Sequence, residues 1–282
     1  MTKKIAVIND LSGFGRCSLT AAISVISAMG VQPCPLPTAI LTAQTGYPSY
    51  YLDDYTDKME YFRTEWEKMG QSFDGIYTGF VSSERQIHQI FRFIDTFRTP
   101  DTFLLVDPVM GDDGIKYDIF TPELLEEMKK LAKKADIITP NLTELCLLTD
   151  ADYHTLTGET DTEHLLNSVS TLARSFCEDG PSHIVITGIR LTDTNGNSLV
   201  GNLYVSEDKE YLCSFPFIGG SFSGTGDLFA SCLAAGIAKG QDMTDIIQIA
   251  GKFLETAITD SVRENVPRND GINYEKYLSM LM

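Results

Sequence analysis

The chain has 282 residues, long for one average domain and within the range of a single large α/β domain. Its 39 Asp and Glu residues outnumber its 22 Lys and Arg residues, which gives a formal charge of −17. This charge argues against nucleic acid and an anionic membrane surface as partners, but it leaves room for a small anion held locally.

The sequence carries no targeting or metal-site signal. The first apolar stretch is broken by Asn9 and Asp10, so it fits neither a signal peptide nor a membrane span, and a cytoplasmic protein is expected. The six cysteines show no CxxC spacing and the four histidines no ligand pattern, so reduced thiols are expected and a zinc site is not. No repeat or Pro/Gly linker divides the sequence, which predicts one domain over 1–282.

Strand and helix signals alternate along the chain. Short β-branched runs predict strands buried on both faces at 4–9, 103–108, 135–140 and 183–188. Periodic apolar residues predict helices over 18–30, 52–70, 83–97, 121–134 and 162–179, the second of them acidic with its charges facing solvent. Two apolar runs around 206–209 predict a β-hairpin over 197–217. The pattern predicts a three-layer α/β fold with a mostly parallel central sheet, helices on both faces and the hairpin at the sheet edge.

Small polar or acidic residues end four of the predicted strands. They are Asn9 with Asp10, Asp107, Thr139 with Asn141, and Thr187. Ligands of open α/β sheets bind beyond the carboxyl ends of the strands, so these residues are expected to lie on one rim. Each of them taken singly is better explained as a turn residue or a helix cap.

The stretch SGTGDLFA, residues 223–230, combines glycines with a carboxylate at a predicted helix start. Gly224 and Gly226 flank Thr225, so successive N–H groups can point into one concavity where the helix dipole favours negative charge. Asp227 falls in the first turn, where it could accept a hydroxyl proton during phosphoryl transfer. A plain helix cap explains the same residues about equally well.

Three further carboxylates are candidates for a metal and nucleotide site. Glu144 is spaced from Asn141 as in a capping box, and the alternative is that it holds Mg²⁺ through water. Asp107 and Asp112 in DPVMGD would repel it unless cations and a polyphosphate joined them. The sequence has no GxxxxGK[ST] motif, which excludes a P-loop NTPase, and GFGRCS at 13–18 lacks the third glycine of a dinucleotide fingerprint.

The motifs SGTGD, TPNLTE, DPVMGD and VITG resemble those of the ribokinase-like superfamily, and specifically of its pyridoxal/pyridoxamine kinases. DLSGFGRCSLTAAI and TAILTAQTGYPS look like the N-terminal substrate segments of bacterial members, and the resemblance covers roughly residues 4–260. It implies ATP-dependent phosphorylation of the 5′-hydroxymethyl group of pyridoxal, pyridoxamine or pyridoxine. It also implies Mg²⁺, a homodimer, and K⁺ as a candidate monovalent ion.

The resemblance also implies roles for single residues. Asp227 would be the base, and Gly224, Thr225 and Gly226 would form the anion hole. The nucleotide and metal side would comprise Asp107, Asp112, Thr139, Asn141, Glu144, Thr187 and Gly188, with Glu144 and Asp112 serving the metal. The vitamer would contact Asp10, Ser12, Thr45, Gly46 and Asp227, and Tyr117 lies in a segment that helps to cover the site.

Three positions depart from the family pattern, all on the substrate side. Asp10-Leu11 stands where relatives carry Ser-His, Gln44 where they carry His, and Phe80 where they carry Tyr. An acidic Asp10 favours a cationic group, such as the amine of pyridoxamine or a protonated ring nitrogen; this is a hypothesis about vitamer preference.

Three other functions are alternatives to this kinase activity. A hydroxymethylpyrimidine kinase usually ends its anion-hole motif in cysteine, where this chain has Asp227. A sugar kinase generally inserts a lid after the first strand, and there is no room for one between Asn9 and Ser18. A non-catalytic protein that binds vitamin B6 could keep the fold without turnover, because fold does not imply function.

Overall fold

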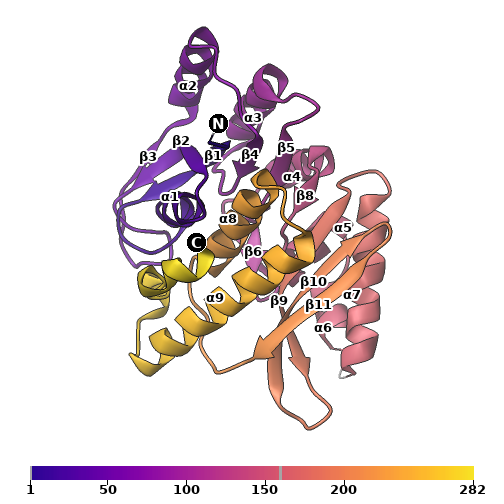
Figure 1. Cartoon of the computed structure of the whole chain (residues 1–282). Coiled ribbons are helices and arrows are strands. Elements are labelled where there is room, and N and C mark those ends of the chain that lie inside the picture. The colour runs from indigo at the N-terminus through magenta and orange to yellow at the C-terminus, as the bar shows by residue number, and fades with distance from the viewer. Residues whose placement is uncertain (1, 159–160) are drawn as a thin grey trace.

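A nine-stranded sheet forms the centre of the computed structural model, which describes residues 2–158 and 161–282 (Figure 1). The strands lie in the order β11-β10-β9-β8-β5-β4-β1-β2-β3. Their bounds are β1 (Lys4–Ser12), β2 (Gln32–Leu41), β3 (Leu52–Asp54), β4 (Gly75–Thr78), β5 (Phe103–Val106), β8 (Ile137–Ile138), β9 (His183–Thr192), β10 (Ser198–Ser206) and β11 (Glu210–Pro216). A separate small hairpin pairs β6 (Gly111–Asp112) with β7 (Ile115–Lys116).

The six strands from β9 to β2 in this order run parallel to one another. The antiparallel strands lie at the two edges, β3 beside β2 and the hairpin of β10 and β11 beside β9. The predicted sheet and its edge hairpin are therefore confirmed. Since parallel strands end at the same edge, their carboxyl ends form one rim.

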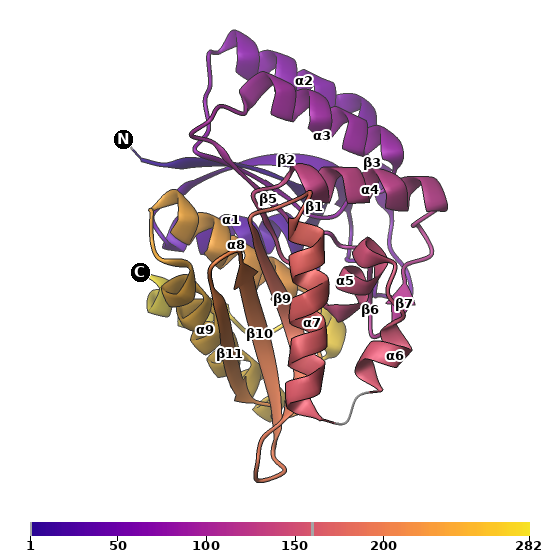
Figure 2. The ribbon, with the colours of Figure 1, turned by 90° about the vertical axis from the view of Figure 1, so that its right-hand side faces the viewer.

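Helices cover both faces of the sheet (Figure 2). The helices are α1 (Ser18–Ala28), α2 (Thr56–Lys68), α3 (Glu84–Phe97), α4 (Pro122–Lys134), α5 (Leu142–Thr149), α6 (Tyr153–Thr157), α7 (Thr162–Cys177), α8 (Thr225–Ala238) and α9 (Met243–Arg263), followed by the 3₁₀ helices η1 (Arg268–Asp270) and η2 (Glu275–Leu281). One core joins the sheet to α3, α4, α5 and α7, and a second joins it to α1, α8 and α9. The predicted three layers are confirmed.

The composition of α8 positions the site. Its small residues Ala230, Ala234 and Ala235 are fully buried against the second core, so the helix lies close to the sheet. Gly236 allows a close contact with α9, because a Cβ there would lie 2.6 Å from Ile246. The N-terminal end of α8 is thereby fixed near the ends of β1 and β4.

Three predicted boundaries were wrong. The segment expected as one helix over 52–70 begins with β3, because Leu52 pairs with Leu41 of β2, and the helix α2 starts only at Thr56. The helix expected over 18–30 ends at Ala28, and the strand expected over 135–140 spans two residues. All six cysteines are free thiols, as expected. Within 2–158 and 161–282, none of the helices combines the length and the apolar character that crossing a bilayer requires.

Candidate active site

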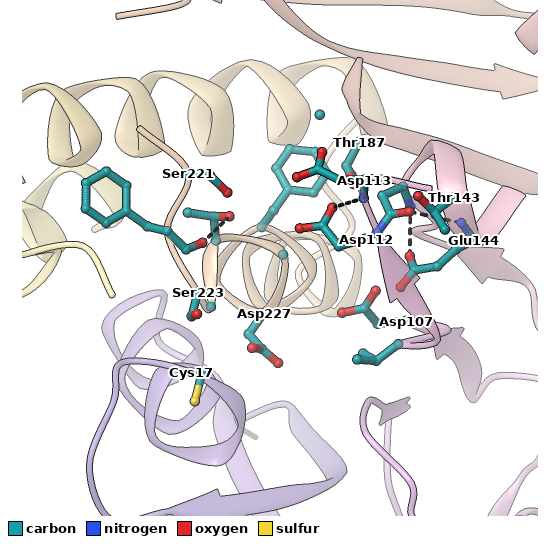
Figure 3. Close-up of a pocket in the computed structure, with 18 of the residues that line it drawn as sticks. Cys17, Asp107, Asp112, Asp113, Thr143, Glu144, Thr187, Ser221, Ser223 and Asp227 are labelled. Carbon is teal, nitrogen blue, oxygen red and sulfur yellow. Dashed lines mark hydrogen bonds between the residues drawn. The ribbon is translucent and has the colours of Figure 1, made fainter. Parts of the chain in front are cut away.

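A cavity of about 820 Å³ opens at the carboxyl ends of the parallel strands (Figure 3). Of the residues predicted to form the site, it is lined by Asp10, Ser12, Thr45, Asp107, Asp112, Tyr117, Thr139, Asn141, Glu144, Thr187, Gly188, Gly224, Thr225, Gly226 and Asp227. Asn141 and Thr187 also pair through an isolated β-bridge. The single rim expected from the sequence is therefore confirmed. Gly46 is not among the lining residues; its N–H donates instead to Oε1 of Gln44 at 2.8 Å.

The start of α8 is held tightly against the start of α1. Gly224 is the N-cap of α8 and has φ +84°, a left-handed conformation that glycine adopts without strain. A Cβ at this position would lie 2.0 Å from the carbonyl oxygen of Arg16. Gly226 has nothing within 4 Å of a Cβ, so only the first glycine of the motif is required by packing. Asp227 follows in the first turn, where its partly buried side chain lines the cavity.

The pKa of the Asp227 carboxyl group is set by opposing effects. Burial raises its pKa to about 6, and the nearby charge of Asp10 adds to this, while hydrogen bonds from the backbone of Ser18 and the side chain of Asn9 lower it. The group is therefore mostly ionised at pH 7, yet its pKa is close enough to this pH for it to take up a proton. A general base needs this combination.

Asn9, at the end of β1, fixes the orientation of Asp227. Its Nδ2 donates to Oδ1 of Asp227 at 3.0 Å. Its Oδ1 accepts from the backbone N–H of Asp10 at 2.9 Å and of Phe80 at 2.8 Å, so the amide can present only its NH₂ group to the carboxylate. The sequence placed Asn9 on the rim without a role, because no motif joins it to a residue 218 positions away.

Asp107 faces the same space as Asp227 and is buried (Figure 3). Burial and the charge of Asp227 raise the pKa of Asp107 to about 8, against a lowering hydrogen bond from Thr139. The Oγ1 atom of Thr139 donates to Oδ1 of Asp107 at 3.0 Å. A buried carboxyl group whose ionisation is opposed by a neighbouring carboxylate is suited to a site that receives a cation together with its ligand.

Glu144 forms the capping box that its spacing from Asn141 allowed. Its Oε2 accepts from the backbone N–H of Asn141 at 2.8 Å, and the side chain of Asn141 accepts from the N–H of Glu144 at 2.9 Å. Its Oε1 accepts from the N–H of Met110 at 3.0 Å. Burial, followed by the charge of Asp107, raises its pKa well above the ordinary value. Each oxygen keeps a lone pair that could accept from a water molecule.

The described side chains do not form a site that would coordinate a metal ion directly. In the described part of the chain, no group of three or more His, Cys, Asp or Glu side chains is placed to hold a metal ion. Mg²⁺, however, usually keeps several waters and binds one or two carboxylates plus the phosphates of a substrate. Glu144 and Asp112, which both line the cavity, fit that second mode.

A family model described as phosphomethylpyrimidine kinase matches residues 15–270. The chain belongs to this family. Over all of its length it is 37% identical, with a TM-score of 0.89, to a Bacteroides thetaiotaomicron protein described as a phosphomethylpyrimidine kinase and crystallised with pyridoxal, 96% of which is covered. Over 91% of the chain it is 26% identical to a pyridoxine/pyridoxal/pyridoxamine kinase of Bordetella avium, 86% of which is covered.

A third relative is a Schizosaccharomyces pombe protein assigned as a pyridoxal kinase. It is 31% identical over 170 residues, which make up 59% of this chain and 47% of that protein. Pyridoxal kinases thus recur among the relatives, and the predicted resemblance to the vitamin B6 branch of the ribokinase-like superfamily is confirmed.

The three departures from the family pattern lie together. Asp10, Gln44 and Phe80 all line the cavity. Asp10 is 5% exposed, and Oγ of Ser12 donates to its Oδ2 at 2.8 Å. Burial raises the pKa of Asp10, while hydrogen bonds from Ser18 and Ser12 lower it. All three departures from the pyridoxal kinase pattern therefore lie on the cavity that the sequence predicts as the vitamer site.

Sequence reasoning missed many of the lining residues, among them Arg268, Arg190 and Cys17, because no motif marks them. Arg268 lies with Nη2 3.4 Å from Oδ2 of Asp112, and the guanidinium of Arg190 lies 3.5 Å from the ring centre of Phe217. Cys17 lines the cavity beside Asp227, and burial, with the charges of Asp227 and Asp10, raises its pKa to about 12. This thiol stays protonated at neutral pH and is no nucleophile.

Proposed function

We propose that the chain transfers the γ-phosphoryl group of ATP to the 5′-hydroxymethyl group of a vitamin B6 vitamer: pyridoxal, pyridoxamine or pyridoxine. The observation that carries this proposal is the partly buried Asp227 at the start of α8, with a pKa raised to about 6 and its orientation fixed by Asn9. The bound pyridoxal of the Bacteroides thetaiotaomicron relative supports the choice of substrate.

In this reaction Asp227 accepts the proton of the substrate hydroxyl as its oxygen attacks the γ-phosphorus atom, and the bond from that phosphorus to the β,γ-bridging oxygen breaks. ADP leaves with the bridging oxygen. The N–H groups that begin α8, at Gly224, Thr225 and Gly226, stabilise the charge on the transferred group, because the helix dipole favours negative charge there.

The nucleotide lies along the other half of the rim, against Asp107, Thr139, Asn141, Thr187 and Gly188. Glu144 and Asp112 would hold Mg²⁺ through water, and the ion supplies charge neutralisation for the phosphates. The acidic cavity itself supports a cation requirement, because the charge of Asp107 opposes the ionisation of Glu144 and the charge of Asp227 opposes that of Asp107. We also propose a role for K⁺ beside Asp112, a homodimeric state and a cytoplasmic location. These three proposals are supported by the family resemblance alone.

Hydroxymethylpyrimidine is the alternative substrate. The family model and the Bacteroides thetaiotaomicron relative are described as phosphomethylpyrimidine kinases, but the pyridoxal in that relative's structure and the pyridoxal kinases among the relatives favour the vitamer. The two substrates share an aromatic ring with a hydroxymethyl group, so the same base and anion hole would serve both. The choice between them falls to the wall of Asp10, Gln44 and Phe80.

ATP consumption with Mg²⁺ and K⁺, measured against pyridoxal, pyridoxamine, pyridoxine and hydroxymethylpyrimidine, tests the proposal. We expect turnover of at least one vitamer. Asp227→Asn should lower kcat at least ~10²-fold, the usual size of a general-base effect, while the vitamer still binds. Turnover of the pyrimidine alone would identify the alternative, and turnover of none by the wild-type protein would overturn the proposal.

A further inference from the structure

The C-terminal 3₁₀ helix η1 connects two loops of the cavity. We call residues 44–47 the substrate loop and residues 223–226 the anion-hole loop. The backbone N–H of Ser223 donates to the carbonyl of Arg268 at 3.1 Å, which joins η1 to the anion-hole loop. The Nδ2 of Asn269 donates to the carbonyl of Gly46 at 2.6 Å, which joins η1 to the substrate loop. The hydroxyl of Tyr47 also donates to Asp270.

Gln44 lies between these three segments and bonds to each. Its Oε1 accepts from Gly46, within its own loop. Its Nε2 donates to the carbonyl of Asn269 at 3.1 Å and to Oγ of Ser223 at 3.3 Å. Only 9% of the residue is exposed, so these bonds are largely shielded from water.

The packing around Gln44 leaves little freedom for the loops to shift. A Cβ on Gly15 would lie 2.8 Å from Cγ of Gln44, and a Cβ on Gly46 would lie 2.8 Å from Oδ1 of Asn269. The glycines at these positions therefore permit a close approach of the backbone to the two amide side chains. A histidine at position 44, as in related kinases, has no amide group with which to make the same bonds.

We propose that Gln44 and Asn269 are positioning residues that hold the substrate loop in register with the anion-hole loop, so that the vitamer hydroxyl and the transferred phosphoryl group meet in line. The inference rests on the proposed function, since it concerns the vitamer reaction. Gln44 lines the cavity, whereas Asn269 is not among the lining residues. Asn269 can therefore affect turnover only through its neighbours, and its side chain reaches the substrate loop at the carbonyl of Gly46.

Small displacements of bound groups are costly to a transfer reaction, because a shift of about 1 Å can lower the rate ~10²-fold. We therefore expect Asn269→Ala and Gln44→Ala each to lower kcat about 10-fold or more with ATP and vitamer both saturating. Because both act through the same connection, the double variant should lose at least about threefold less than the product of the single effects. Asn273→Ala is the matched control, since its side chain bonds to Glu264 and to neither loop.

A merely local role for these residues gives different results. If the variants change only KM for the vitamer and leave kcat within about twofold, or if their effects multiply, the inference is overturned. Asn269→Ala decides alone if Gln44→Ala fails to fold, because Asn269 lies at the partly exposed side of η1.

Amide hydrogen exchange of the free protein gives a readout that needs no turnover. Gln44→Ala should speed exchange in residues 223–226, although these lie about 180 positions away in sequence, and Asn273→Ala should not. Unchanged exchange in the anion-hole loop would overturn the inference whichever substrate the enzyme uses. Inactivity of the wild-type protein towards every vitamer would instead overturn the proposed function.

Discussion

The side-chain amide of Asn9 donates to the carboxylate of Asp227 at 3.0 Å, while its own oxygen is held by two backbone N–H groups. The bond stabilises the ionised form of Asp227 and so lowers the pKa of a group that burial raises. In the proposed reaction the base must be ionised, and kcat/KM should therefore fall as the pH drops through about 6.

Asn9→Asp tests this relationship. The substitution keeps the shape of the side chain and the oxygen that binds Asp10 and Phe80, but it replaces the donor to Asp227 by a second acid. We expect the acidic limb of the kcat/KM profile to move upward by about one pH unit, the size of one lost charge-assisted hydrogen bond. Asn167→Asp on the exposed side of α7 is the control for added charge. A lower rate with an unmoved limb would show that Asn9 acts only in folding.

Gly224 and Gly226 should respond very differently to alanine. At Gly224 the φ of +84° and the carbonyl oxygen of Arg16, 2.0 Å from a Cβ, would force the start of α8 away from α1. We expect kcat/KM to fall ~10²-fold or more and the melting temperature to drop. Gly226→Ala meets nothing within 4 Å and should melt within about 2 °C of wild type. Equal melting temperatures for the two variants would contradict this account.

Local signals were enough to predict the rim. GTGD, the terminal residues of four strands and the Asn141–Glu144 spacing each act within a few residues, and the parallel sheet brings their positions together. The roles of Asn9 and Gln44 could not be predicted in this way. Their partners lie 218 and 225 positions away and share no spacing or periodicity with them.

The strand β2 was not predicted, because Pro33, Pro35 and Pro37 lack the N–H that a central strand needs. The structure resolves the conflict. The N–H of Gln32 donates to Lys3 beside β1, so the alternate positions that carry proline direct their nitrogens away from β1. On the side of β2 that faces away from β1, β3 pairs only with residues 39–41. The proline stretch of β2 therefore has no strand partner on that side. Proline is tolerated here because of how distant segments pair in the sheet, and the local sequence pattern does not show that pairing.

Asp10 should govern the choice among vitamers. Its carboxylate lines the cavity, and Oγ of Ser12 donates to its Oδ2 at 2.8 Å. A carboxylate here favours the cationic amine of pyridoxamine over the aldehyde of pyridoxal. Asp10→Ser, the residue that related kinases carry, should raise kcat/KM for pyridoxal relative to pyridoxamine by about 10-fold, the value of one charge-assisted bond.

Asp101→Ser, at an exposed position outside the cavity, is the control for this specificity experiment, since it makes the same substitution away from the site. It should leave the ratio of the two vitamers close to that of the wild type. Equal turnover of pyridoxal by wild type and Asp10→Ser would count against a role of Asp10 in vitamer choice.

Asp107 should make the free protein less stable as the pH rises. Its pKa is raised from 3.8 to about 8 in the folded chain, chiefly by burial and then by the charge of Asp227. The folded state therefore binds this proton more tightly than the unfolded state does. Stability from this group is greatest below about pH 4, declines as the pH rises towards 8, and changes little above that value.

Asp107→Asn removes the ionisation while the amide oxygen can still accept from Thr139. We expect the variant to melt at least about 2 °C above wild type at pH 8 and to show a flatter dependence of melting temperature on pH between 6 and 8. Asp101→Asn, at an exposed position, is the matched control and should follow the wild type. Parallel curves for wild type and Asp107→Asn would mean that Asp107 is already ionised in the folded chain. In that case, Asp107 would not need an incoming cation in order to ionise beside Asp227.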